Sequence, residues 1–181
     1  EGLYLHFSAI AREVDLPLVP YNVPGRTGCN MLPSTLARLA NEFPHVVGIK
    51  EATGDMNQAS EIIESCPSRF SLLGGDDLTA LPLMALGGKG LISVTSNLVP
   101  GKIATMCSAM AAGRDEEARE IHHKLFPLHR AMFMVSNPIP VKTALKMMGR
   151  MSDEMRLPLC RMNKEDMGKL AEVLRSQGLL A

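Results

Sequence analysis

One lysine in an apolar run is the side chain best placed for covalent chemistry. Lys50 directly follows the apolar run Val46–Ile49, and lysine is among the residues least often buried. If Lys50 points into a covered sheet, desolvation lowers the pKa of its ammonium and exposes the amine lone pair. Such an amine can form a Schiff base with a carbonyl compound. The alternative is a lysine just past the strand end with its ammonium in solvent, and periodicity alone leaves both open.

Two polar side chains upstream of Lys50 could assist that amine. Tyr21 ends the preceding apolar stretch, and neighbouring parallel strands lie only about 5 Å apart, so its phenol could move protons for the amine. Arg26 lies in the turn-rich loop 22–28 and could hold a substrate carboxylate through a two-pronged contact. A packing tyrosine and a solvated arginine are the alternatives.

Three other motifs have simpler explanations than catalysis. The acidic pair Asp76 and Asp77 could form a metal or acid–base site, but capping of a helix that begins at Leu78 explains both residues. The run 87–90 lacks the Ser/Thr and the spacing of a phosphate-binding loop and predicts a turn. The pair 122–123 consists of two histidines on an amphipathic helix without a matching ligand pair, which favours packing or solvated histidines over a metal site.

Alternating apolar and amphipathic stretches indicate the elements that carry these residues. The predicted strands are 16–23, 46–51, 70–74 and 90–95. The predicted helices before, between and after these strands are 3–14, 32–43, 57–65, 78–86 and 100–112. This pattern predicts an α/β fold with a parallel sheet covered by helices. The polar residues gather where the strands end, and ligands bind at such carboxyl ends.

The alternation stops after Gly113, where only helices are predicted, over 115–135, 141–148 and 164–177. The sequence therefore predicts two domains, residues 1–112 and residues 113–181.

Composition narrows the class of protein. The 181 residues are 46% apolar, with 19 basic and 19 acidic side chains, and a chain without net positive charge is a poor partner for nucleic acid or an anionic membrane. No apolar run reaches the ~20 residues of a membrane span. The four cysteines are far apart in the sequence, which argues against a zinc or disulfide framework and predicts reduced thiols in a cytoplasmic protein.

Five motifs occur in an order that is more specific than any one of them. They are Tyr21–Gly28 (YNVPGRTG), Gly48–Gly54 (GIKEATG), Gly74–Asp77 (GGDD), Gly90–Thr95 (GLISVT) and Asn137–Lys142 (NPIPVK). Together they resemble the dihydrodipicolinate synthase family over essentially the whole chain. The resemblance implies a (β/α)8 TIM barrel with a C-terminal helical domain. This chain would be the second half of the barrel, strands 5–8, with the helical domain.

The resemblance also implies an activity. The family condenses pyruvate with aspartate semialdehyde on the diaminopimelate route to lysine. It implies that Lys50 forms the pyruvate imine, Tyr21 relays protons and Arg26 holds the carboxylate of the aldehyde, while the backbone at Ile92 lines the pyruvate pocket with Gly75 nearby. The resemblance implies no metal and no dissociable cofactor, because Lys50 supplies the electron sink. It also implies a cytoplasmic homo-oligomer such as a homotetramer.

Other hypotheses remain open. N-acetylneuraminate lyase and the keto-deoxy sugar acid aldolases are similar in the tyrosine and lysine strands but do not usually carry Arg-Thr-Gly in the loop. The family's first four β-α units, with a paired-threonine motif, a second tyrosine and a lysine feedback site, have no counterpart here. A catalytically inactive fragment is therefore a further hypothesis. Unpaired edge strands at 18–23 and 90–95 predict an oligomer, and the missing threonines predict negligible synthase activity for the 181 residues alone.

Overall fold

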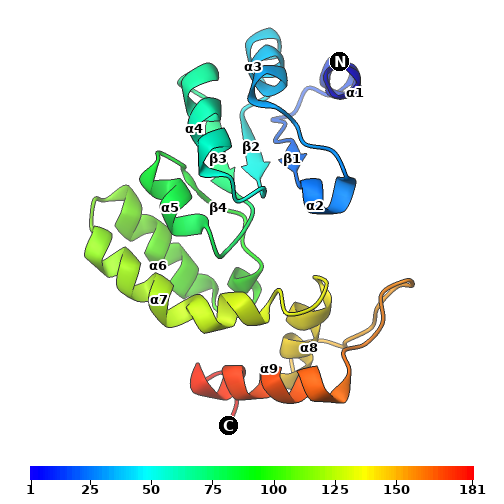
Figure 1. Ribbon diagram of the computed structural model, residues 1–181, viewed down its shortest axis with the longest axis vertical. Coiled ribbons are helices and arrows are strands. Elements are labelled where there is room, and N and C mark those ends of the chain that lie inside the picture. Colours follow the sequence, from blue (N-terminus) through cyan, green and yellow to red (C-terminus); the bar gives the residue numbers. More distant parts are fainter. The chain divides into compact units, whose positions relative to one another are not determined.

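A four-stranded parallel sheet forms the centre of the N-terminal part of the chain. The computed structural model describes residues 1–181, in two units that comprise Glu1–Ile92 and Ser93–Ala181. The strands are β1 (Tyr21–Asn22), β2 (Gly48–Glu51), β3 (Ser71–Gly74) and β4 (Gly90–Leu91), and they neighbour one another in sequence order (Figure 1). All three pairings are parallel. The predicted α/β fold with a parallel sheet is confirmed.

Helices precede and connect these strands. They are α1 (Gly2–Glu13), α2 (Pro24–Thr27), α3 (Pro33–Glu42), α4 (Met56–Ser65) and α5 (Ala80–Ala85). Asp55 caps α4, since its side chain accepts hydrogen bonds from the amides of Asn57 at 2.8 Å and Gln58 at 3.2 Å. The short helix α2 was not predicted and lies inside the segment expected to be a loop.

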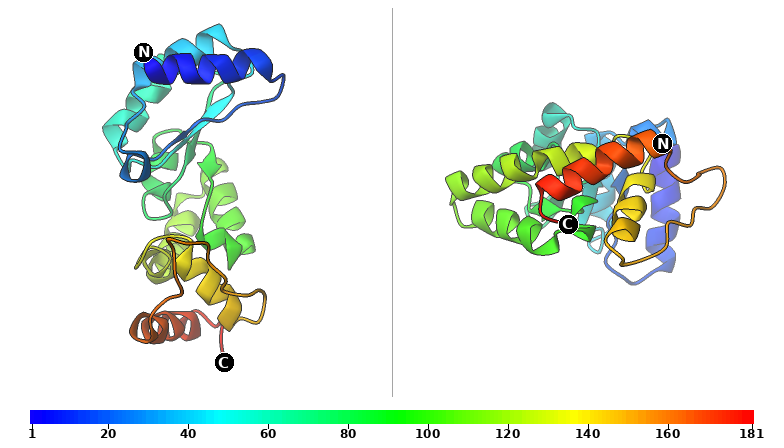
Figure 2. Two further views of the ribbon diagram at one scale, coloured as in Figure 1. Left: turned by 90° about the vertical axis from the view of Figure 1, so that its right-hand side faces the viewer. Right: turned by 90° about the horizontal axis from the view of Figure 1, so that it is seen from below.

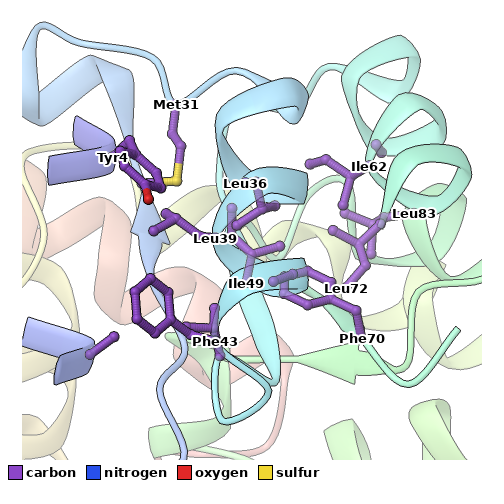
Figure 3. Packing of buried hydrophobic residues seen from close by; sticks show 14 residues of the cluster. Tyr4, Met31, Leu36, Leu39, Phe43, Ile49, Ile62, Phe70, Leu72 and Leu83 are labelled. Atoms are coloured by element: carbon purple, nitrogen blue, oxygen red, sulfur yellow. The ribbon is translucent and has the colours of Figure 1, made fainter. Parts of the chain in front are cut away.

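The apolar core of this unit lies between the sheet and helices α3 and α4 (Figure 3). Leu36 and Leu39 of α3, Ile49 of β2 and Ile62 of α4 are almost completely buried. Burying one such side chain is worth about 1.5–3 kcal/mol. Because successive side chains of a strand point to opposite faces, burial of Ile49 in this core directs its neighbour Lys50 to the other face of the sheet.

Two of the predicted strands are shorter than expected. Residues 16–20 form a single isolated bridge, between Leu18 and Val46, and the carbonyl of Pro20 accepts a hydrogen bond from the amide of Lys50 at 2.9 Å. Pro17 and Pro20 have no amide hydrogen to donate, so a longer strand does not form. The predicted strand 90–95 ends at Leu91, and a 3-10 helix, η1 (Thr95–Asn97), follows it. Ser93 favours this turn because its Oγ accepts a hydrogen bond from the amide of Ser96 at 2.8 Å.

The C-terminal unit contains helices only. After η1 come α6 (Pro100–Ala111), α7 (Asp115–Ala131), α8 (Ile139–Met147) and α9 (Lys164–Ser176). Helices α6 and α7 lie side by side, and α9 packs against α7 and α8 (Figure 2). Asn163 caps α9, since its Oδ1 accepts a hydrogen bond from the amide of Asp166 at 2.8 Å.

The division of the chain differs from the sequence pattern in one respect. The boundary between the two units falls between Ile92 and Ser93 in the sequence, so α6 belongs to the C-terminal unit. The sequence-based division into residues 1–112 and 113–181 stays a prediction. None of the helices is long and apolar enough to cross a membrane.

Candidate active site

Lys50 and Tyr21 lie side by side where strands β1 and β2 end. The register pairs Tyr21 with Lys50, and the Lys50 Nζ lies 4.0 Å from the centroid of the Tyr21 ring. Tyr21 is 42% exposed and Lys50 is half-buried. The residues that follow them, Asn22 and Glu51, are buried on the opposite face. The parallel register therefore presents the amine and the phenol together on the accessible face.

The electrostatic surroundings of Lys50 favour a reactive amine. Burial lowers the pKa of Lys50 below its ordinary value of 10.5, and the positive charge of Arg26 lowers it further. The carboxylate of Asp77 acts in the opposite direction and raises that pKa. Since burial is the largest of these effects, the structure favours the interior lysine over the solvated one that the sequence left open.

Gly75 lies directly against the side chain of Lys50. A Cβ atom at Gly75 would be 2.8 Å from the Cβ of Ala52 and 3.1 Å from the Cγ of Lys50. The amide of Gly75 donates a hydrogen bond to the carbonyl of Glu51 at 2.6 Å. Only glycine leaves enough room here for the lysine side chain in this position.

Arg26 and Ile92 lie toward the same end of the sheet as Lys50. Arg26 is an exposed residue of α2, which ends at Gly28 with a left-handed φ of 67°. The amide of Ile92 donates to the carbonyl of Gly74 at 2.8 Å, so Ile92 continues β4 toward this end. The roles expected for Tyr21, Lys50, Gly75, Arg26 and Ile92 in binding and catalysis stay predictions.

The acidic pair 76–77 differs from the expected helix cap. Asp76 Oδ1 accepts a hydrogen bond from the amide of Leu78 at 3.0 Å, but α5 begins only at Ala80 and has no side-chain cap. Asp77 is completely buried and interacts electrostatically with Lys50. The predicted cap by Asp76 or Asp77 of a helix at Leu78 was wrong, because the chain makes an additional turn before α5 and carries Asp77 inward.

Sequence reasoning also missed a partly buried polar cluster behind the lysine. It comprises Asn22, Asn30, Glu51 and Gln58, which are joined by hydrogen bonds between their side chains. Asn22 and Glu51 are only 3% and 2% exposed. Polar residues next to Tyr21 and Lys50 at both strand ends were the available signal.

Two of the three histidines of α7, His122 and His129, pack inside the helical unit, and His123 is exposed. His122 is buried, and its ring centroid lies 5.4 Å from that of Phe126 and 5.8 Å from that of His129. His122 is therefore a packing histidine, one of the two kinds of environment that the sequence favoured. No group of three or more His, Cys, Asp or Glu side chains in the structure could hold a metal ion.

Known proteins are similar to almost all of this chain. Residues 1–177 match the model of the dihydrodipicolinate synthetase family. A 4-hydroxy-tetrahydrodipicolinate synthase of Thermodesulfovibrio yellowstonii is 57% identical over 180 residues, which are 99% of this chain and 62% of the relative. The chain thus spans about 62% of the length of the curated relatives it matches.

Two solved structures show the same arrangement of elements. Dihydrodipicolinate synthase from Aquifex aeolicus is 44% identical, with a TM-score of 0.97. The matched region is 98% of this chain and 61% of the Aquifex chain. The chloride-inhibited dihydrodipicolinate synthase from Acinetobacter baumannii, complexed with pyruvate, is 42% identical, with a TM-score of 0.94. The matched region is 99% of this chain and 61% of the Acinetobacter chain.

Proposed function

Because the chain belongs to the dihydrodipicolinate synthetase family, we propose that it carries the Schiff-base site of a 4-hydroxy-tetrahydrodipicolinate synthase. The reaction is the condensation of pyruvate with aspartate semialdehyde in lysine and diaminopimelate biosynthesis. The observation that carries this proposal is the half-buried Lys50, with a lowered pKa, 4.0 Å from the ring of Tyr21 at the carboxyl end of a parallel sheet.

Lys50 is the nucleophile of the proposed reaction. Its neutral amine attacks the carbonyl carbon of pyruvate, and loss of water from the adduct leaves a protonated imine. That imine withdraws electrons from the neighbouring methyl group, so a proton leaves the methyl carbon and an enamine forms. The ring of Tyr21 lies beside the amine, and its phenol is the proposed proton carrier in both steps. The carbon nucleophile then adds to the aldehyde carbon of the second substrate.

Arg26 is the proposed partner of the second substrate's carboxylate. Its guanidinium lies on the exposed helix α2, and its charge reaches Lys50 strongly enough to lower the pKa of that residue. A guanidinium binds a carboxylate through two parallel hydrogen bonds. The names of the relatives also support the synthase over N-acetylneuraminate lyase or a keto-deoxy sugar acid aldolase.

We further propose that the sheet is the second half of a (β/α)8 barrel and that the protein is a cytoplasmic homo-oligomer. The sheet has β1 and β4 at its edges, and Val19, Tyr21 and Ile92 expose apolar surface there. Burial of about 500 Å² of such surface per chain is worth roughly 12 kcal/mol before the costs of association. Light scattering on the purified chain tests this, and a stable monomer would contradict it. The four cysteines form no disulfide, which favours the cytoplasm.

Trapping with borohydride tests the proposed function. The chain is incubated with pyruvate and borohydride, digested and mapped by mass spectrometry. The proposal expects a reduced pyruvate adduct on Lys50 and on no other lysine. Absence of an adduct from the folded chain, or an adduct on another lysine, would overturn it.

A further inference from the structure

The accessible pair Tyr21 and Lys50 has a buried polar counterpart on the other face of the same two strands. The register that pairs Tyr21 with Lys50 also pairs Asn22 with Glu51. The Nδ2 of Asn22 donates a hydrogen bond to the Oε2 of Glu51 at 2.9 Å. Both side chains are almost completely buried, where an unpaired polar group would be costly.

The Glu51 carboxylate is satisfied by neutral N–H donors from three different segments. Its Oε2 accepts from the Nδ2 of Asn22 at 2.9 Å and from the Nε2 of Gln58 at 3.1 Å. Its Oε1 accepts from the backbone amide of Thr53 at 2.7 Å. Because a carboxylate is an acceptor only, these three bonds orient β1, the loop after β2 and helix α4 around one residue.

The segment that carries Arg26 is fastened to this cluster at both of its ends. It begins directly after Asn22, and it ends where the Oδ1 of Asn22 accepts a hydrogen bond from the amide of Met31 at 2.9 Å. The Nδ2 of Asn22 donates to the Oδ1 of Asn30 at 2.8 Å, and the Nδ2 of Asn30 donates to the Oε1 of Gln58 at 2.8 Å. One asparagine side chain thus closes the whole Arg26 segment.

We propose that Asn22, Glu51, Asn30 and Gln58 are positioning residues that hold the Arg26 segment, residues 23–30, in register with the Tyr21–Lys50 pair. The inference rests on the proposed function, because it assigns the cluster to the alignment of the second substrate's carboxylate with the pyruvate imine. The cluster does not touch the Nζ of Lys50, so it governs the orientation of Arg26 and leaves imine formation to Lys50 and Tyr21.

Two variants disturb the cluster in different ways. Glu51→Gln keeps the size of the side chain, but it places an NH2 group against at least one of the three N–H donors. Asn30→Ala removes the bridge between Asn22 and Gln58 at an exposed position of the loop, so it does not threaten the core. Asp55→Asn is the matched control, since it changes an exposed carboxylate to an amide near the cluster and asparagine still caps α4.

The experiment has three measurements on the parent chain and the three variants. Hydrogen exchange of the amides of residues 25–31 reports the order of the segment. NMR titration with succinate semialdehyde, a carboxylate-bearing aldehyde, reports binding at Arg26. Borohydride trapping with pyruvate reports imine formation at Lys50.

The expected result separates the two steps. Glu51→Gln and Asn30→Ala increase the exchange rate in the segment and the dissociation constant of succinate semialdehyde by about tenfold, while trapping at Lys50 stays at the level of Asp55→Asn. Unchanged exchange and unchanged aldehyde binding in both variants would overturn the positioning role, as would an equal loss of trapping and of aldehyde binding. Failure of the parent chain to trap pyruvate would overturn the proposed function instead, and the exchange rates would still decide whether the cluster orders the segment.

Discussion

Lys50 and His122 are both bases whose pKa is lowered by burial, but they lie in different kinds of surroundings. Lys50 is half-buried at the end of the sheet in the N-terminal unit, where Arg26 and Asp77 act on its charge in opposite directions. His122 is buried within the helical unit, and its Nδ1 has no hydrogen-bond partner. The charge of His123 lowers the pKa of His122 further.

The comparison shows that a lowered pKa does not by itself make a catalytic site. Lys50 has a phenol beside it, a glycine that leaves it room and an accessible face for a carbonyl compound. His122 has three aromatic rings around it, those of His123, Phe126 and His129, and no hydrogen-bond partner for its Nδ1. Burial lowers the pKa of both residues, but only the neighbours of Lys50 make its amine available for chemistry. His122 is a packing residue that resists protonation.

The largest effect is expected from removal of the Lys50 amine. Lys50→Ala should abolish the pyruvate adduct, because it removes the amine whose pKa is lowered by burial beside the ring of Tyr21. Lys89→Ala, in the same unit, is the control and should trap pyruvate like the parent chain. Mass spectrometry after borohydride reduction measures the adduct in both variants. An adduct that persists in Lys50→Ala would show that Lys50 is not the reactive amine.

A smaller effect is expected from loss of the guanidinium next to the site. Arg26→Leu should weaken the binding of a carboxylate-bearing aldehyde about ten- to a hundredfold, the cost of roughly 1.5–3 kcal/mol for a lost charge-assisted hydrogen bond. Formation of the pyruvate imine should change much less. NMR titration and borohydride trapping measure the two steps, with Arg12→Leu as the surface control. Equal losses in both would make Arg26 a structural residue.

The two charges near Lys50 should shift its pH dependence in opposite directions. Imine formation requires the neutral amine, so its rate should rise with pH to a midpoint below the ordinary lysine pKa of 10.5. Arg26→Gln removes a like charge and should raise that midpoint, whereas Asp77→Asn removes an opposite charge and should lower it. The rate of adduct formation across pH 6–11 measures this, and shifts of the same sign would refute the assignment.

The smallest effect is expected from His122, and it concerns stability. Its pKa is lowered in the folded chain, so the unfolded chain binds the proton more tightly and acid favours unfolding. The free energy of unfolding should therefore decrease as pH falls below 6.5, the ordinary histidine value. In His122→Phe the stability should fall less with acid than in the parent chain. Each kcal/mol of free energy retained corresponds to roughly 2–4 °C in Tm. Thermal unfolding at several pH values measures it, and His6→Phe, at an exposed position, should leave the decrease unchanged.

Much of the fold could be predicted from local pattern. The sequence predicted the helices Gly2–Glu13, Pro33–Glu42, Met56–Ser65 and Pro100–Ala111 to within about two residues. These helices depend on hydrophobic spacing, which is a property of short segments. The length of the last strand was wrong, because the hydroxyl of Ser93 offers the backbone a turn that periodicity does not reveal.

The sequence by itself determined the parallel α/β order, the family resemblance and the types of residue at the site: an amine, a phenol and a guanidinium near strand ends. Only the tertiary structure decided that Lys50 lies over Tyr21, that Asp77 turns inward and that Asn22 and Glu51 share a buried cluster. The physical reason is the register between strands, which is a relation between distant segments. It sets which residue stands beside which and which face each side chain takes, and no single segment carries that information.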